Sequence, residues 1–248
     1  MNKSLLIINI AGLGAEAITS ATPNLLGLSE VGGRLAVQPP VPALTSVSQA
    51  TLLTGTRPVQ HGIVANGWYF RELAEVLNWQ RSARLLTGAP LWEAFRERDP
   101  GVRCANLFWR YATHASADLN VTERPTYWAD GRKSPDIYTE PSTVRDELVE
   151  RLGPFPLFRF WGPAADITSS RWIADATLHV LGQQQYGVIL TYLPHLDYDH
   201  QRYGPDSPQG SAALQAVDRE AGRLIDAAQA AGLRVAVLSD YAFEKVSQ

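Results

Sequence analysis

The stretch at residues 45–66 contains the polar side chains with the clearest chemical use. A proline-rich approach ends at Pro42, and a short helical run follows it and stops at Gly55, a residue typical just past a helix end. Thr45 or Ser46 is predicted at the N-cap of this helix, where free backbone N–H groups and the helix dipole favour a bound phosphate or sulfate. A threonine hydroxyl at such a position either only caps the helix or attacks a phosphoryl group bound there.

Acidic and histidine side chains follow two apolar runs late in the sequence. Asp197 and Asp240 each stand just past one of these runs, and His195 and His200 flank Asp197. A hydroxyl that attacks phosphorus must lose its proton, and the charge on the phosphoryl oxygens must be offset; a divalent metal ion does both. Zinc accepts Asp and His ligands. The competing interpretation is that the acidic residues are solvated, but the position after a buried run favours a site for Asp197.

Continuous apolar runs predict strands that are buried on both faces, at residues 5–10, 188–193 and 235–238, with a fourth strand at 102–109. Helical patterns lie between them, at 91–98, 172–181 and 211–231. This alternation predicts an α/β fold, a three-layer αβα sandwich around a mainly parallel sheet. Sites in such sheets lie at the carboxyl ends of the strands, so we expect the candidate side chains to gather at that edge.

Residues 110–163 differ in composition from the rest of the chain, with repeated prolines and many aromatic side chains. We interpret this segment as a cap insertion that packs over the sheet, with one helix at 142–152. The turn at 130–133 carries two cations, Arg132 and Lys133. They either meet an anionic group of a substrate or are solvated.

The residues after Thr45 also carry an ordered pattern, TG-x-x-P-x-x-HGI-x-x-N, whose last position is Asn66. This segment resembles the nucleophile segment of nucleotide pyrophosphatase/phosphodiesterases in the alkaline phosphatase superfamily. The chain is similar to a bacterial branch of the type I phosphodiesterase/nucleotide pyrophosphatase-like family through stretches such as HGIVANGWYFRE and YLPHLDYDHQRYGP. The resemblance extends over nearly the whole chain and implies an alkaline phosphatase-like fold.

The resemblance places the family's nucleophile on Thr45 and its phosphoryl-oxygen-binding asparagine on Asn66. It implies a metal-assisted hydrolase of phosphodiesters, pyrophosphates or related phosphate esters, in which Thr45 forms a covalent phospho-enzyme. The implied substrate is a small phosphorylated molecule. The alternative is a non-catalytic relative, a pseudoenzyme, that binds a phosphorylated ligand or a protein partner through the same pocket.

The resemblance also implies a divalent metal, with zinc as the expected ion, at one or two sites. Two ligand positions keep their carboxylates, Asp197 and Asp240, while Ala11 stands where the family has a first-strand aspartate. We expect at most one weakened metal site, built on Asp197 with His200 or His195 beside it and Asp240 less firmly placed.

Two neutral side chains stand where the family has histidines. Gln201 comes four residues after Asp197, and Tyr241 directly follows Asp240. A glutamine could offer a carbonyl oxygen, but that ligand suits harder cations better than zinc. We therefore expect these two replacements to weaken metal binding.

Length, charge and cysteine content bound the remaining possibilities. The 248 residues fit one catalytic domain, 1–248, and related proteins are longer, which predicts that the chain is C-terminally incomplete. The net charge of −3 gives no basis for binding nucleic-acid polymers. No apolar run reaches the ~20 residues of a membrane span, and we assign the run at 5–13 to a strand rather than to a signal peptide. The single cysteine, Cys104, excludes an internal disulfide and fits a reducing, cytoplasmic compartment.

Overall fold

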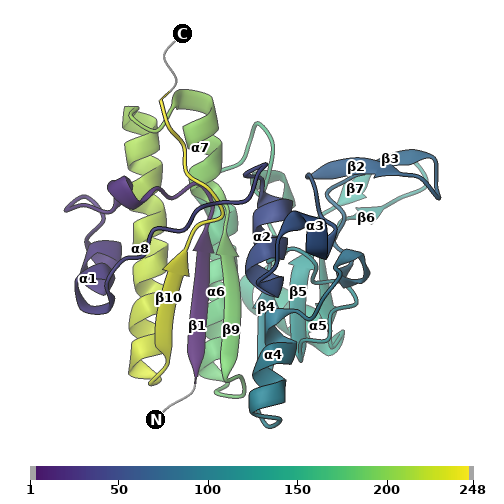
Figure 1. Ribbon diagram of the computed structural model, residues 1–248, viewed down its shortest axis with the longest axis horizontal. Coiled ribbons are helices and arrows are strands. Elements are labelled where there is room, and N and C mark those ends of the chain that lie inside the picture. Colours follow the sequence, from purple (N-terminus) through teal and green to yellow (C-terminus); the bar gives the residue numbers. More distant parts are fainter. Residues whose placement is uncertain (1–3, 246–248) are drawn as a thin grey trace.

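A six-stranded sheet forms the centre of the computed structural model, which describes residues 4–245 (Figure 1). Its strands follow the order β10-β1-β9-β4-β5-β8. The first five in that order run parallel, and β8 is antiparallel to β5. The strands are β1 (Leu5–Ile10), β4 (Cys104–Leu107), β5 (Leu119–Glu123), β8 (Ile137–Glu140), β9 (Val188–Leu193) and β10 (Arg234–Leu238).

The three strands predicted from the most apolar runs are confirmed as parallel neighbours. β1 lies between the other two, and its Ile7 pairs with Ala236 on one side and with Leu190 on the other. Five of the six residues of β1 are buried, because strands flank both of its edges and α8 packs against it. A strand in this position is mostly apolar, with Asn9 as its buried polar residue, which explains why the sequence locates it so well.

Helices cover both faces of the sheet, which confirms the predicted three-layer αβα architecture. On one face, α6 and α8 pack together against β9 and β1, while α2 and α4 lie over the opposite face (Figure 1). No helix within residues 4–245 has both the length and the apolar content needed to cross a membrane. The helices are α1 (Pro23–Gly32), α2 (Thr45–Thr54), α3 (Pro58–His61), α4 (Leu91–Arg98), α5 (Thr143–Leu152), α6 (Ile167–Gly182), α7 (His195–Tyr203) and α8 (Pro208–Ala230), with 3₁₀ turns η1 (Ala15–Ala17), η2 (Ala83–Leu85) and η3 (Leu157–Arg159).

The segment 110–163 does not form the separate cap that its composition predicted. It contributes β5 and β8, which extend the central sheet, and α5, which packs against β8. Two of its prolines lie just past strands of the central sheet: Pro125 comes two residues after β5, and Pro141 directly follows β8. Proline lacks the N–H that a strand ladder needs, so here it marks where strands stop. Pro154, Pro156 and Pro163 lie in the loops after α5. What projects from this side of the molecule is two small hairpins, β2–β3 (Gly67–Phe70 and Glu75–Asn78) and β6–β7 (Thr126–Tyr127 and Lys133–Ser134) (Figure 1).

β4 ends earlier than its apolar run predicts, at Leu107. Phe108 and Tyr111 have φ values of 65° and 60°, in the left-handed region that residues other than glycine rarely adopt. The chain therefore leaves the sheet, but its side chains stay in the core, and the indole of Trp109 donates to the carbonyl of Thr191 at 2.9 Å. The run is apolar because all of it is buried, although only part of it is strand.

Candidate functional site

Thr45 is the first residue of α2 and does not cap it. Leu44 takes the N-cap position in an extended conformation, so the prediction that Thr45 or Ser46 caps the helix is wrong. Gly55 ends α2 as predicted, in the left-handed conformation with φ 65°. The Thr45 side chain is almost buried, and its Oγ1 lies 3.3 Å from the hydroxyl oxygen of Tyr241. Its hydroxyl group thus interacts with another part of the site and not with its own helix.

Asn66 lies beside the start of α2. Its Oδ1 accepts a hydrogen bond from the backbone N–H of Ser46 at 3.0 Å, which fixes the orientation of the amide, since only the oxygen can accept. This N–H is one of the four at the start of a helix that have no partner within the helix. The two donors on Asn66 Nδ2 are separate from this bond. The N–H after Thr45 is therefore donated to Asn66 itself, so of the predicted pair of donors only the Nδ2 group of Asn66 is left for a substrate oxygen.

A buried histidine holds the turn before Asn66 against α2. His61 Nδ1 accepts from the N–H of Ile63 at 3.1 Å, and its Nε2 lies 3.0 Å from Thr51 Oγ1. Because Nδ1 is an acceptor, the proton is on Nε2 and the ring is neutral. Burial lowers the pKa of His61, which stabilises this neutral form. His61 therefore positions the turn that carries Asn66.

The loop after β4 holds α2 from the other side. The hydroxyl of Tyr111 donates to the carbonyl of Ser46 at 3.1 Å, and the backbone N–H of Arg110 donates to Gln49 Oε1 at 2.7 Å. Tyr111 is fully buried, so its ring also packs in the core beneath α2. The start of α2 is thus fixed by contacts within the chain, as a preorganised binding site requires.

Asp197 lies in the first turn of α7, and both of its carboxylate oxygens are hydrogen bonded. The hydroxyl of Tyr241 donates to Oδ1 at 2.8 Å, and Nε2 of Gln201 donates to Oδ2 at 2.6 Å. Asp197 and Gln201 meet because residues four apart share one face of a helix. Burial raises the pKa of Asp197 more than these two bonds lower it. Thr45, Tyr241 and Asp197 consequently form one continuous chain of polar groups.

Asp240 directly follows β10 and lies within electrostatic reach of Asp197. Neither of its oxygens has a well-formed hydrogen bond among residues 4–245. Burial raises the pKa of Asp240 to about 7, and the charge of Asp197 adds to this rise, while the nearby backbone of Gly12 and Tyr241 offsets part of it. Asp240 is therefore close to the midpoint of its titration at neutral pH.

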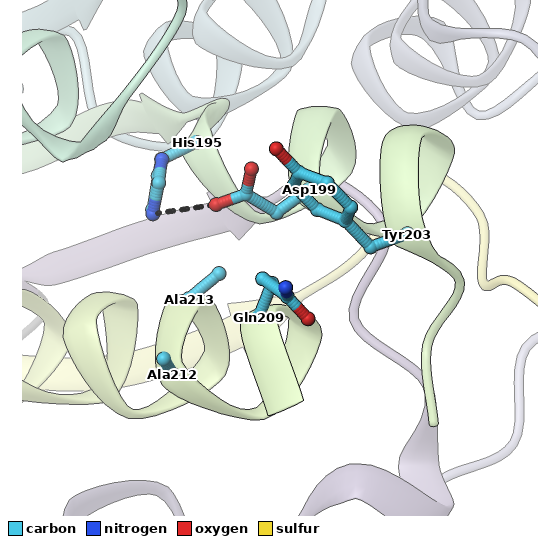
Figure 2. Close-up of a pocket in the computed structure, with 6 residues that line it drawn as sticks. All are labelled: His195, Asp199, Tyr203, Gln209, Ala212 and Ala213. Atoms are coloured by element: carbon cyan, nitrogen blue, oxygen red, sulfur yellow. Dashed lines mark ion pairs between the residues drawn. The ribbon is translucent and has the colours of Figure 1, made fainter. Parts of the chain in front are cut away.

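The two histidines that flank Asp197 lie on different faces of α7. The ring of His200 packs edge-on against Phe243, with centroids 5.7 Å apart, on the side of α7 that faces Tyr241. Burial lowers the pKa of His200, and the charge of Asp197 opposes this shift. His195 faces α8 instead, and its Nε2 lies 3.8 Å from Asp199 Oδ2. His195 and Asp199 line a hollow of about 370 Å³ (Figure 2). The other residues that line it are Tyr203, Gln209, Ala212 and Ala213. The structure thus brings His200 towards Asp197 and separates His195 from it.

The donors gathered around Asp197 do not fit a tight zinc site. Such a site needs three or four protein ligands, and in the described part of the chain no group of three or more His, Cys, Asp or Glu side chains is arranged to hold a metal ion. Asp197 is already bonded to two neutral side chains, and Ala11 offers no ligand atom. A divalent metal at Asp197, His200 and Asp240 stays a prediction.

The mostly parallel sheet, covered by helices on both faces, defines an alkaline phosphatase-like α/β fold, with the start of α2 and two acidic residues at one edge. A sequence model of the family described as type I phosphodiesterase / nucleotide pyrophosphatase matches residues 5–248. The chain belongs to this family.

A relative from Schizosaccharomyces pombe, described as an uncharacterized pyrophosphatase/phosphodiesterase, is 26% identical to the chain over 237 residues. The similarity covers 90% of this chain and 40% of the relative, so the chain spans less than half of the relative's length. Both descriptions name enzymes that cleave phosphodiester or pyrophosphate bonds.

Three residues have contacts that sequence reasoning did not find. The sequence indicates Tyr241 and Gln201 only as replacements for histidines, and it gives no sign that both donate to Asp197. Tyr111 carries no motif at all, although it holds the carbonyl of Ser46. The partners are 44 and 65 residues away for the two tyrosines, beyond the reach of any local pattern. The only signal in the sequence was that Tyr241 and Gln201, at two positions of the family pattern, are residues that can form hydrogen bonds.

Proposed function

We propose that the protein is a hydrolase that cleaves phosphodiester or pyrophosphate bonds in a small phosphorylated substrate, with Thr45 as its nucleophile. The observation that carries this proposal is the position of the Thr45 hydroxyl. It lies at the start of α2, 3.3 Å from the hydroxyl of Tyr241 and one residue before the Ser46 N–H that bonds Asn66. Membership of the family supports the class of reaction.

This arrangement can hold a phosphoryl group next to a nucleophile. The dipole and free N–H groups at the start of α2 attract anionic oxygens, and Asn66 Nδ2 can donate to one of them. Attack by Thr45 Oγ1 on phosphorus would form a phosphothreonine and release the leaving group, and water would then hydrolyse this intermediate. Donors that are already in place when charge develops are the usual source of a large part of the rate.

Two other expectations, a divalent metal and a cytoplasmic location, stay predictions from the sequence and do not carry the proposal. Cys104, on which the predicted location rests, is buried in β4. Burial raises its pKa to about 11, so the thiol stays protonated at neutral pH. It therefore has no part in the proposed chemistry.

Substitution of Thr45 tests the proposal, with bis-(p-nitrophenyl) phosphate and inorganic pyrophosphate as probes. Thr45→Ala should lower kcat by at least ~10³-fold, while Thr45→Ser keeps a hydroxyl and should keep part of the activity. Mass spectrometry of the quenched wild type should show a covalent phosphoryl adduct that Thr45→Ala lacks. Wild-type turnover by Thr45→Ala would contradict the proposal. A parent protein that binds phosphate but turns over neither probe would favour the pseudoenzyme alternative.

A further inference from the structure

We infer that Tyr241 and Gln201 take the place, beside the nucleophile, of the divalent metal that the family resemblance implies. In this arrangement Tyr241 orients Thr45 and receives its proton, Asp197 is the final acceptor, and Gln201 fixes that carboxylate. The inference rests on the proposed function, because it concerns how the same Thr45 is activated. It starts from the finding that two neutral side chains bond both oxygens of Asp197 at 2.8 and 2.6 Å.

The number of protons fixes the direction of each hydrogen bond. A tyrosine hydroxyl has one proton, and Tyr241 donates it to Asp197 Oδ1. In the 3.3 Å contact with Thr45, Tyr241 must therefore be the acceptor and Thr45 the donor. The single proton of Thr45 then points at Tyr241, which leaves both lone pairs of Oγ1 for attack on phosphorus. Tyr241 is thus a positioning residue for the nucleophile.

Gln201 and Phe243 keep this chain of groups in place. A carboxylate offers only acceptors, so the amide nitrogen of Gln201 must face Asp197 Oδ2, as the 2.6 Å contact shows. With both oxygens held, Asp197 cannot turn away from Tyr241. The ring of Phe243 meets the ring of Tyr241 edge-on, with centroids 5.9 Å apart, and supports its orientation. Asp197 is buried and Tyr241 is partly exposed, while Gln201 covers this carboxylate from the surface.

The proton and the bonds balance over the two steps. In the first step, the bond from Thr45 Oγ1 to phosphorus forms and the bond from phosphorus to the leaving oxygen breaks. The proton of Thr45 passes to Tyr241 as the proton of Tyr241 passes to Asp197, and the leaving group departs as an anion that solvent can protonate. In the second step, water attacks phosphorus, the bond to Thr45 breaks, and the proton returns from Asp197 through Tyr241 to Thr45. The proton of the attacking water leaves with the phosphate product or to solvent.

The first test measures metal binding and does not depend on activity. After treatment with a chelator, isothermal titration with zinc chloride should show no stoichiometric binding by the wild type. The double variant Gln201→His with Tyr241→His places two imidazoles beside Asp197 and should bind one zinc ion. Adding Asp197→Asn to that double variant is the matched control, and it should abolish binding. Stoichiometric zinc binding by the wild type would overturn the inference, and so would a double variant that binds none.

The second test measures the role of the Tyr241 hydroxyl. Tyr241→Phe keeps the ring that packs against Phe243, and it should lower kcat by about 10²-fold, the usual size of a proton-transfer contribution, with KM unchanged. Tyr203→Phe removes an exposed hydroxyl at the end of α7 and serves as the control with wild-type kcat. Thermal midpoints confirm that each variant is folded. Turnover by the wild type should also be insensitive to a chelator.

The outcomes separate this inference from the proposed function. If Thr45→Ala is inactive but Tyr241→Phe has the kcat of the wild type, Thr45 is still the nucleophile and the role of Tyr241 is wrong. Loss of wild-type turnover on chelation, with recovery on adding zinc, would likewise overturn the inference and leave the hydrolase in place. If Thr45→Ala is as active as the wild type, the proposed function itself fails.

Discussion

The hydroxyl of Thr45 is free to contact other groups because neighbouring residues cap the helix in its place. Leu44 takes the N-cap position, and Asn66 takes the N–H of Ser46 that a capping hydroxyl would otherwise bond. The side chain of Thr45 is left to contact Tyr241. Single-residue substitutions around this helix start therefore separate contributions to rate from contributions to stability.

Asn66→Ala should slow turnover by ~10²–10³-fold, because it removes a preorganised donor to the phosphoryl oxygens. The change also leaves the N–H of the buried Ser46 without its partner, which should cost about 1–3 kcal/mol, so the variant should fold but melt at a somewhat lower temperature. Gln60→Ala, which removes an exposed side-chain bond to the N–H of Arg57, is the control with unchanged turnover. An Asn66→Ala variant that keeps its rate but melts at a lower temperature would show that Asn66 only supports the loop.

His61 should make the protein less stable in mild acid. Its pKa is lowered by burial, so the unfolded chain takes up a proton before the folded chain does. The full contribution of neutral His61 to the free energy of unfolding is present above the pKa of the unfolded chain, about 6.5. This contribution is lost as the pH falls from that value towards the lower pKa of the folded chain.

The measurement compares thermal midpoints at about pH 7.5 and about pH 5.5 for the wild type and His61→Asn. Asparagine can accept the N–H of Ile63 in place of Nδ1 but does not titrate, so the variant should lose less stability between the two pH values. The other histidines are common to both proteins and cancel in the comparison. Parallel losses in the two proteins would show that His61 is not responsible.

At the scale of elements, α2 and α7 present the site because other segments hold both helices. α2 is held by His61 on one side and by Tyr111 on the other. α7 packs against the segments that follow β1 and β10. Gly12, just after β1, forms a bridge with Ala242, just after β10, and lies against the backbone of Asp197. Two glycines near these contacts have positive φ values: Gly12, beside α7, and Gly55, at the end of α2.

Gly12→Ala should destabilise the protein more than Gly55→Ala. Both residues have left-handed backbone conformations, with φ 76° and 65°, so alanine should cost about 1–2 kcal/mol at either position. At Gly55 an added Cβ meets no atom within 4 Å, whereas at Gly12 it would come to 3.0 Å from the ring of Phe243. Unfolding in urea measures both changes. Equal losses of free energy would mean that Phe243 moves aside without cost.

At the scale of the whole molecule, a buried ion pair ties the edge of the sheet to the segments that surround the site. Glu123 on β5 accepts from Arg81 at 2.7 Å and from Arg110 at 3.2 Å. Burial raises the pKa of Glu123, but the two guanidinium groups together hold it below its usual value. Arg110 also donates to the carbonyl of Trp79, next to β3, so one buried carboxylate connects three separate segments.

Glu123→Gln should lower the free energy of unfolding by about 3–5 kcal/mol, because it leaves the buried charge of Arg110 without its partner. Asp130→Asn breaks the exposed pair of Asp130 with Arg132 and is the control, with an expected change within about 1 kcal/mol. Unfolding in guanidinium chloride gives both values. A small effect of Glu123→Gln would indicate that water reaches Arg110 in the folded protein.

The centre of the fold and the identity of the candidate site residues could be predicted from the sequence. β1 and β9 have the predicted limits, because a strand with neighbours on both edges is mostly apolar, here with Asn9 and Thr191 as buried polar exceptions. The end of α2 at Gly55 follows equally from local conformation. Prediction from the sequence was less accurate where one residue pattern is typical of two different structures. Prolines between 110 and 163 suggested a cap, but two of them follow strands of the central sheet and three lie in loops after α5. The apolar run after Leu107 suggested a strand but is core in another conformation.

How the site residues contact one another could not be predicted from the sequence and follows from the packing of distant segments. Thr45 and Tyr241 are 196 residues apart, and they are brought together because β10 and β1 are neighbours in the sheet and α2 starts at the same edge. The direction of the Gln201 amide and the faces that His195 and His200 take on α7 depend on the groups packed around them. Periodicity and turn chemistry act over a few residues, whereas a contact between distant segments depends on the order of the strands. That is why the sequence predicted the candidate residues, while only the structure shows that Tyr241 and Gln201 occupy both oxygens of Asp197.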